Sequence, residues 1–443
     1  MAFTTAIAKR LAWVVSHLFM PPAQHLGCTP SNDVGKRQMR RLGSLFALTV
    51  LALSANSAFA GSSDTALKTI VDNAKAAQSD TLLVVHDGKT LVDYRRPGAP
   101  AGPIEMMSST KSLIGLAVGR LVTQGKLKSI DEPVSDFYPE WKQGNKAKIT
   151  IRMLLNHTSG MQNVPMAPVE IYPAPDVYQL ALAAELSDPP GTKFSYNNKA
   201  MNLIGGVIEK ASGKPMDVYI ADELLAPMGI KAAPWNPENR DKAGHPMAMA
   251  GWMSTAQDAA KIGQLVLDNG RWQGKQLVDA DYIKQMVGQS TPLTTGYGLL
   301  WWRRGDGIRF NPAVVERVRA GGDTALADKL ARVAAKVYPT GGDVVEAITA
   351  EGVSRTDMLG MMKANHVTEE DLFANTPIVA WEANGYLGNY IVIVPKAHLV
   401  AVRQIAERKD ADEDHWPYSY AKFSADVIGL GRTYAKDLAV DTP

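Results

Sequence analysis

The sequence is poor in cysteine, because Cys28 is the only cysteine among its 443 residues. A single cysteine excludes an internal disulfide, a cysteine-based zinc site and an iron–sulfur site. No His, Asp and Glu residues stand at zinc-ligand spacing either, so we expect no metal site. Any chemistry must therefore come from ordinary side chains.

The sequence also lacks an excess of charge and a long apolar run. Its 47 basic and 45 acidic side chains leave a net charge of +2, which gives no strong field for nucleic acid. No stretch of about 20 residues is continuously apolar, so we expect no membrane span. After residue 60 neither G-x-x-x-x-G-K-[ST] nor G-x-G-x-x-G occurs, so nucleotide binding has no support and we expect no cofactor. With 46% apolar and 21% charged residues, the composition is that of a globular protein.

Residues 39–60 have the three parts of a secretory signal peptide. A positive head (Met39-Arg40-Arg41) precedes a short apolar body (LGSLFALTVLAL), and Ala58-Phe59-Ala60 supplies an A-x-A cleavage signal. The apolar body is too short for a stable membrane anchor. We therefore predict a periplasmic or secreted bacterial protein that is cleaved after Ala60 and has no membrane span in its mature form.

Residues 1–38 precede the segment at which a signal peptide should begin. We predict that they are a misannotated extension and that Met39 is the true start. The alternative is a long leader in which Leu26-Gly27-Cys28 resembles a lipoprotein site, although His25 stands where an aliphatic residue is expected.

Two β-hairpins enclose a helical middle in the mature chain. Residues 81–96 (TLLVVHDGKTLVDYRR) place two β-rich runs around Asp87-Gly88, and residues 390–403 (YIVIVPKAHLVAVR) do so around a proline. Helical patterns include residues 111–124 and 200–211, and a last one follows at about 419–438. The order predicts an α+β architecture, in which helices flank an antiparallel sheet and form a separate lobe.

One segment, at about 303–376, has the composition of an added helical piece. It contains DTALADKLARVAAKVY and DVVEAITAEGV. We consider two hypotheses for it: a lid or side wall that restricts which chemical group enters a neighbouring site, and a peripheral subdomain or oligomer contact. The oligomeric state stays open.

Ser108 and Lys111 form an S-x-x-K motif at the start of an apolar helical pattern. Three residues' spacing on a helix places the two side chains on one face. A serine hydroxyl needs a base to become nucleophilic, and a lysine can be that base if burial and the helix dipole lower its pKa. The spacing alone is weak evidence for a catalytic pair, since Ser419 and Lys422 repeat it without any companion motif.

The companion motif is Tyr196-Asn197-Asn198, the only Tyr-x-Asn in the chain. A phenol near the lysine can pass the serine's proton to the leaving group. The Asn198 amide offers donors and an acceptor for the lysine or for a substrate carbonyl. The alternative is that Asn197 or Asn198 merely caps the helix that follows.

These motifs, in this order and separation, resemble the serine β-lactamase and penicillin-recognising superfamily. Three phrases resemble its class C-like branch of esterases, D-aminopeptidases and 6-aminohexanoate-dimer hydrolases: IRMLLNHTSGM (151–161), GWMSTAQDAAKIGQLVLDNGRWQGKQLV (251–278) and YGLLWW (297–302). The resemblance runs from about residue 75 to the C-terminus with one interruption. It implies a β-lactamase/transpeptidase-like fold with one hydrolase domain over 61–443.

The family's third element is often Lys-Thr-Gly or His-Thr-Gly, and its place here reads WEANGYLGN (381–389). The resemblance implies that Gly385 lets backbone approach substrate and that the amides of Ser108 and Tyr386 form an oxyanion hole. No Lys or Thr is present to bind a carboxylate, and we expect Glu382 to repel an anion. This departure disfavours β-lactam and D-Ala-D-Ala substrates.

Aromatic residues and one histidine are secondary candidates. Trp301 and Trp381 are predicted to line the substrate cleft, because such pockets favour aromatic side chains, although tryptophans are also ordinary core residues. Trp252 and Trp302 are weaker candidates. His157, in the HTSG phrase, is expected to make structural hydrogen bonds rather than to act as a base.

Taken together, the residues predict a secreted serine hydrolase that cleaves a small ester or amide through an acyl-enzyme. Ser108 is the nucleophile, Lys111 the base and Tyr196 the proton relay, with Asn198 in support. One alternative is a β-lactamase or D,D-peptidase. Another is a catalytically inactive relative that only binds a ligand in the same cleft.

Overall fold

The computed structural model describes residues 51–164, 167–231, 235–368, 371–407, 420 and 422–440. The chain folds into two compact units, of which the larger spans residues 66–307 and 375–443 and the smaller includes Ile308–Ala374. The predicted extension (1–38) and residues 39–50 of the predicted signal peptide lie outside the described residues, as does Ser419. Within the described part, no helix combines the length and the apolar character needed to cross a bilayer.

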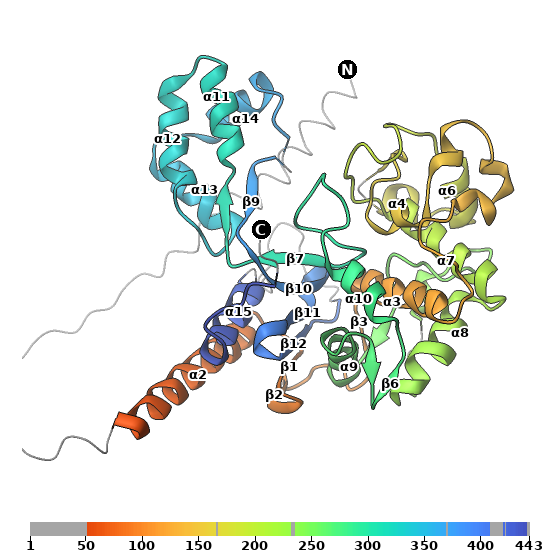
Figure 1. Ribbon diagram of the computed structural model, residues 1–443, viewed down its shortest axis with the longest axis horizontal. Helices are drawn as coiled ribbons and strands as arrows, with labels where there is room; N and C mark the ends of the chain where they lie inside the picture. Colours follow the sequence, from red (N-terminus) through yellow and green to blue (C-terminus); the bar gives the residue numbers. More distant parts are fainter. Residues whose placement is uncertain are drawn as a thin grey trace, which may run out of the picture. The chain divides into compact units, whose positions relative to one another are not determined.

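A six-stranded sheet in the order β2-β1-β12-β11-β10-β7 forms the centre of the larger unit (Figure 1). All neighbouring strands are antiparallel. The strands are β1 (Thr81–His86), β2 (Lys89–Arg95), β7 (Trp302–Gly305), β10 (Ile378–Gly385), β11 (Asn389–Val394) and β12 (Leu399–Gln404). Both predicted hairpins are present. At the first, Asp87 (φ 47°) and Gly88 (φ 73°) adopt the left-handed backbone of a two-residue hairpin turn.

The edge strand β7 lies where the sequence predicted the start of the added segment. Its residue Trp302 pairs with Glu382 of β10, and Gly305 pairs with Ile378. Residues 303–305 therefore belong to the main sheet, and the boundary predicted near 303 lies too early.

Helices cover both faces of the sheet. On one face, α2 (Leu51–Ala76) and α15 (Phe423–Tyr434) share an apolar cluster with the sheet that includes Ile70, Val392 and Phe423. On the opposite face lie α3 (Thr110–Thr123) and α9 (Ala256–Leu267). There Gly263 of α9 lies so close to Val400 of β12 that any side chain at this position would clash.

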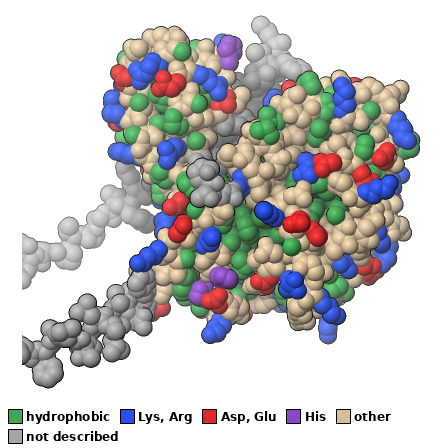
Figure 2. Space-filling model, viewed as in Figure 1, with side chains coloured by type: hydrophobic (Ala, Val, Ile, Leu, Met, Phe, Trp, Pro, Cys, Tyr) green, Lys and Arg blue, Asp and Glu red, His purple; other side chains and the backbone are tan. Residues whose placement is uncertain are grey.

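A helical lobe continues the core of the α3 face. Its helices are α4 (Ile151–Leu155), α5 (Ala167–Glu170), α6 (Val177–Ala183), α7 (Asn198–Ser212) and α8 (Met216–Ile220), and α10 (Ala280–Val287) packs against α3. Two short strand pairs complete the larger unit: β3 (Ile104–Glu105) with β4 (Met253–Ser254), and β5 (Arg271–Trp272) with β6 (Lys275–Gln276). On the face seen in Figure 2, basic and acidic side chains are interspersed, in keeping with the small net charge.

The smaller unit has an apolar core of its own, which includes Phe310, Val314, Leu330 and Val344. It consists of β8 (Ile308–Phe310), α11 (Pro312–Ala320), α12 (Thr324–Ala334), α13 (Gly341–Ala350), α14 (Arg355–Ala364) and β9 (Phe373–Asn375). Capping boxes begin both α13 and α14, so local sequence defines where these helices start.

Candidate active site

Ser108 lies on a short 3-10 helix, η1 (Met107–Ser109), which leads directly into α3. The neighbouring side chains fix this segment on both sides. The Ser109 hydroxyl donates to the Asn389 carbonyl at 2.7 Å, and the Thr110 hydroxyl accepts from the Trp252 amide at 3.2 Å. Ser108 is therefore held between the sheet and the first turn of a buried helix, as a nucleophile requires.

Lys111 contacts Ser108 directly. Its Nζ lies 2.9 Å from Ser108 Oγ and donates to the Met249 carbonyl at 2.8 Å. The lysine is only 2% exposed. Burial disfavours the charged ammonium and lowers the pKa of Lys111 to about 7. A neutral amine is thus available near neutral pH, one hydrogen bond away from the hydroxyl.

Tyr196 completes the group. Lys111 Nζ lies 5.0 Å from the centre of its ring, and the Ser108 side chain interacts with its hydroxyl. Burial raises the pKa of Tyr196 to about 12, and the interaction with Ser108 offsets part of that rise. The phenol therefore keeps its proton at neutral pH and can donate it. The structure brings together all three side chains that the two motifs predicted to meet.

The two asparagines after Tyr196 have different positions. Asn197 is the N-cap of α7, because its Oδ1 accepts from the amides of Lys199 and Ala200 at 3.0 Å. Asn198 is the first residue of α7, and its buried Oδ1 accepts no hydrogen bond from the described residues. The hydrogen bond to Lys111 that we considered for Asn198 is made by the Met249 carbonyl instead.

The position of Met249 depends on a residue that sequence reasoning missed. Its amide donates at 3.2 Å to Oδ1 of Asn202, a residue of α7 that is only 1% exposed. Asn202 therefore links α7 to the backbone that accepts from Lys111. A backbone carbonyl carries no residue-type pattern, so no motif could have identified this acceptor.

Aromatic rings surround Tyr196. Trp302 of β7 stacks on it with ring centres 6.0 Å apart and an angle of 18°, and Tyr297 packs at right angles to Trp302 at 4.8 Å. Trp302 is half-buried, whereas Trp301 is 0% exposed and belongs to the core. The prediction that Trp301 lines the cleft is therefore wrong. A fully enclosed side chain cannot touch substrate, and the neighbouring Trp302 lies beside the phenol.

The other predicted cleft residues belong to β10 or directly follow it. Trp381 is half-buried and packs against the α3-side core. A side chain at Gly385 would clash with the Met106 carbonyl, so the glycine is required where β10 meets the segment before Ser108. Tyr386 follows at once with a 55% exposed side chain. This proximity is compatible with the predicted oxyanion hole, which stays a prediction.

Glu382 does not act as we expected. Its carboxylate is 0% exposed and receives two hydrogen bonds from Arg304, at 2.6 and 3.1 Å. It also accepts from Ser424 of α15, on the sheet face opposite α3. The prediction that Glu382 repels an anionic substrate is therefore wrong, because its charge is paired and faces away from Ser108.

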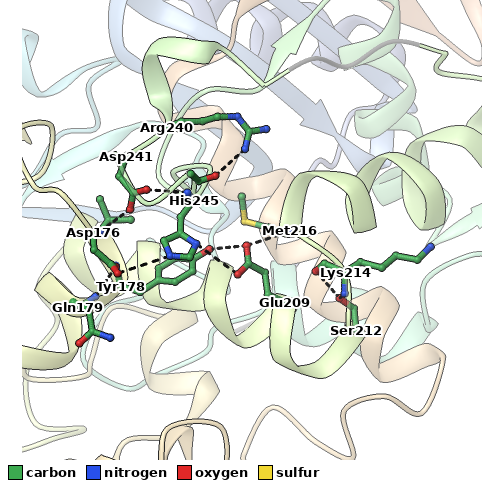
Figure 3. Close-up of polar contacts among 12 residues, drawn as sticks. Asp176, Tyr178, Gln179, Glu209, Ser212, Lys214, Met216, Arg240, Asp241 and His245 are labelled. Atoms are coloured by element: carbon green, nitrogen blue, oxygen red, sulfur yellow. Dashed lines mark hydrogen bonds and ion pairs between the residues drawn. The ribbon is translucent and has the colours of Figure 1, made fainter.

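One group of potential metal ligands lies outside this site. Asp176, Asp241 and His245 bring ligand atoms within 4.8 Å of one another, which their sequence spacing did not indicate. Figure 3 shows them with Tyr178 of α6 and Glu209 of α7. The His245 ring stacks on Tyr178 at 4.0 Å and lies between Asp176, at 3.9 Å, and Glu209, at 3.8 Å.

The aspartates of this group already have backbone partners. Asp176 Oδ1 caps α6 by accepting from the amides of Tyr178 and Gln179, both at 2.9 Å. The two oxygens of Asp241 accept from the amides of Val177 and His245, both at 2.8 Å. These contacts account for the group as a polar network that joins α6, α7 and the loop at 240–246 (Figure 3).

Comparison with known proteins identifies the fold. A solved structure of a proposed 6-aminohexanoate-dimer hydrolase from Bacillus anthracis superposes with a TM-score of 0.55 at 18% identity, covering 83% of this chain and 82% of the other. EstCE1, a hydrolase with promiscuous acyltransferase activity, gives a TM-score of 0.51 at 15% identity, covering 84% and 99%. Structures at such low identity show the fold alone, and they confirm the predicted β-lactamase/transpeptidase-like architecture.

Sequence relatives match over shorter spans. Protein flp of Staphylococcus aureus (strain MW2) is 29% identical over 167 residues, 34% of this chain and 33% of its own length. Esterase EstB of Burkholderia gladioli is 28% identical over 148 residues, 28% of this chain and 36% of its own length. Each match thus spans about one third of the relative. A profile described as Beta-lactamase, in contrast, matches residues 67–421. The predicted resemblance is confirmed, and the chain belongs to the beta-lactamase family.

Proposed function

We propose that this protein is a secreted serine hydrolase that cleaves an ester or an amide through an acyl-enzyme, of the carboxylesterase or 6-aminohexanoate-oligomer hydrolase type. One observation carries the proposal: Ser108 Oγ lies 2.9 Å from the buried Lys111 amine, and the Ser108 side chain also interacts with the Tyr196 hydroxyl. Both partners have the protonation state that acyl transfer needs at neutral pH.

Acylation follows from these contacts. Neutral Lys111 takes the hydroxyl proton while Ser108 Oγ attacks the substrate carbonyl carbon, and the C–O double bond opens to an oxyanion. The amides of Ser108 and Tyr386 stabilise that charge, worth roughly 3–4 kcal/mol per donor. Tyr196 then gives its proton to the leaving alcohol or amine as the carbonyl–leaving group bond breaks, and the Lys111 ammonium reprotonates the phenol.

Deacylation reverses the roles. The phenol takes a proton from water as it passes its own proton to the neutral Lys111 amine, and the water oxygen attacks the acyl carbon. A proton then returns to Ser108 Oγ by the same route as the ester bond to the serine breaks. Each proton thus moves among the same three side chains. The residues involved supply this chemistry without a metal or a cofactor.

The third motif favours an ester or amide over a β-lactam. Residues 381–389 contain no Lys or Thr to bind a substrate carboxylate. The half-buried Trp302, which stacks on Tyr196, favours an apolar acyl group near the reacting centre. EstB and the B. anthracis protein carry names of these two classes, which supports the same choice.

Export rests on the A-x-A signal. In the full chain, helix α2 runs through the predicted cleavage position at Ala60. Cleavage there leaves residues 61–76, including Ile70 and Ala74, which pack on the sheet. Removal of the leader is therefore compatible with an intact sheet-side helix.

The test is a substrate panel on the purified protein: p-nitrophenyl esters of increasing acyl length, the 6-aminohexanoate dimer and nitrocefin. We expect ester or amide turnover, and we expect Ser108→Ala to lower kcat/KM by at least about 10³-fold. Ser419→Ala, in the second S-x-x-K copy, is the matched control and should leave turnover unchanged.

Other results would point elsewhere. Turnover that survives Ser108→Ala would overturn the nucleophile assignment. Nitrocefin hydrolysis faster than ester hydrolysis would instead support the β-lactamase alternative, and ligand binding without any turnover would support the inactive relative.

A further inference from the structure

His157 lies against Tyr196, although the mechanism above assigns it no step. It stands in the loop after α4, in the phrase HTSG, and is only 1% exposed. Three contacts connect it to Tyr196 and to the two residues that flank Tyr196 in the chain. No other residue of the predicted site relates to the phenol in this way among the residues that the structure describes.

The contacts act on the backbone on both sides of the phenol. The His157 carbonyl accepts from the Ser195 amide at 2.8 Å, and its ring Nδ1 accepts from the Asn197 amide at 3.2 Å. Between them, the imidazole lies against the Tyr196 ring, with centres 4.5 Å apart and an angle of 42°. One residue therefore holds the amide of the residue before Tyr196, the amide of the residue after it and the ring itself.

The protonation state of the His157 imidazole suits a role in holding Tyr196 in place. Burial, together with the nearby Lys111, lowers the pKa of His157 to about 3, so the ring is neutral at physiological pH. Because Nδ1 accepts a hydrogen bond, the ring proton resides on Nε2, which is buried and has no partner among the described residues. A neutral ring whose acceptor nitrogen is already used cannot serve as the base for Ser108.

The backbone of His157 is also unusual. Its φ of 58° lies in the left-handed region, which is unfavourable for a residue that carries a side chain. The HTSG loop thus holds an unfavourable conformation at the residue that meets Tyr196. Strain of this kind persists where surrounding contacts over-determine it.

We propose that His157 is a positioning residue for Tyr196, which it holds by three contacts so that the phenol can deliver its proton to the leaving group. This inference rests on the proposed function, because it assigns His157 to the proton relay of that reaction. A displacement of about 1 Å at such a relay can cost up to 10²-fold in rate.

A positioning role makes a specific kinetic prediction. A p-nitrophenolate ion is a weak base and leaves without a proton, whereas an ethoxide ion must be protonated as it leaves. A misplaced phenol should therefore slow the cleavage of an ethyl ester much more than that of the p-nitrophenyl ester of the same acid. A merely structural loss lowers the amount of active protein and slows both substrates equally.

The experiment compares His157→Phe, His157→Asn, Tyr196→Phe and Ser108→Ala on the two esters of the acid that the wild type prefers. His157→Phe keeps a ring but leaves the Asn197 amide unpaired, and we expect kcat/KM, which reports acylation, to fall about 10-fold more on the ethyl ester than on the p-nitrophenyl ester. His157→Asn restores an acceptor and tolerates the left-handed backbone, so it should recover most of this loss while keeping a selective defect of about 3-fold. Tyr196→Phe should show the largest selective loss.

The matched control is His245→Phe, because His245 is also a histidine stacked on a tyrosine, Tyr178. This variant should slow both esters equally.

The outcomes separate the two proposals. Equal losses on both esters in the His157 variants, beside a selective loss in Tyr196→Phe, would overturn the positioning role and leave the proposed function intact. Turnover of both esters by Ser108→Ala would overturn the proposed function itself. If His157→Phe does not fold, His157→Asn decides alone, and the absence of any selective defect in it contradicts the proposal.

Discussion

At the scale of single residues, the burial of Lys111 both enables the chemistry and destabilises the fold. A buried amine loses hydration, and the Met249 carbonyl and Ser108 are the only hydrogen-bond partners of its Nζ among the described residues. The unfolded chain holds this proton up to a pH of about 10.5, whereas the folded protein releases it at about 7. Between these values the unfolded state binds more protons, so stability rises with pH. The cost of burial is fully present below pH 7 and disappears as the pH approaches 10.5.

The variant Lys111→Met should make this cost measurable. Methionine fills similar space and has no proton to lose, so the free energy of unfolding of the wild type should rise by about 2–3 kcal/mol relative to the variant between pH 6 and pH 9. Urea titrations of both proteins at several pH values measure the difference. A constant difference across this range would show that the amine is charged in the folded protein.

Sequence predicted which three side chains meet at the candidate site but not the groups that support them. Ser108, Lys111 and Tyr196 stand in motifs whose spacing reflects one helical turn and one loop, so local pattern suffices for them. Trp302 and the Met249 carbonyl reach the site through long-range packing, which leaves no local pattern. The role expected of Glu382 failed for the same reason, since only the pairing with Arg304 shows which way its side chain points.

At the scale of elements, the position of Tyr196 depends on α7 and on the helix packed against it. Helix α6 packs along α7, and Asp176 caps the first turn of α6 with two amide hydrogen bonds. The polar network in Figure 3 then connects that cap with Glu209 of α7 through His245. The cap of α6 thus contributes to the stability of the helical lobe.

We predict that Asp176→Ala lowers the free energy of unfolding by about 1–2 kcal/mol, because two amides of α6 lose their acceptor. Asp176→Asn keeps an acceptor for the two amides and should lower the free energy of unfolding by only about a few tenths of a kcal/mol. The exposed Asp136 makes no side-chain hydrogen bond among the described residues, so Asp136→Ala should stay within about 0.5 kcal/mol. Chemical denaturation compares the three variants, and a loss in Asp136→Ala equal to that in Asp176→Ala would contradict the capping argument.

The hairpins and the long helices could be read from sequence, whereas β7 could not. The turn at Asp87-Gly88 and the periodic pattern of α3 are local features, so residues 81–96 and 111–124 were assigned correctly. Strand β7 is only four residues long, Trp302–Gly305, and stands beside charged residues that resemble the helical segment after it. Its identity as a strand comes from pairing with β10, more than 70 residues further along the chain.

At the scale of the whole molecule, the smaller unit is inserted between two neighbouring strands. The chain leaves the sheet after β7 and returns at β10, where the Asp306 amide donates to the Pro377 carbonyl at 3.3 Å and the Thr376 hydroxyl donates to the Gly307 carbonyl at 3.1 Å. These two hydrogen bonds hold the ends of the insertion side by side. The sheet therefore does not need Ile308–Ala374 to bring β7 and β10 together.

Replacing Ile308–Ala374 by Asn-Gly should leave a folded protein, because this dipeptide closes a two-residue hairpin. We expect a soluble monodisperse product that still hydrolyses p-nitrophenyl acetate, and the same dipeptide added between Gly307 and Ile308 of the full chain is the control.

The dependence of the rate on acyl length then separates the two hypotheses for the segment. A broader profile supports a lid, and an unchanged profile supports a peripheral subdomain or oligomer contact. Loss of folding in the shortened chain alone would contradict the independence of the two units.

The adjacent ends of the insertion also affect how the chain can vary. The chain leaves β7 and enters β10 at adjacent positions of one strand pair. A segment of almost any size can therefore be inserted there without shifting the register of any strand. Length differences among homologues should accordingly gather at this turn, and a fluorescent reporter spliced into it would leave the pairing on either side undisturbed.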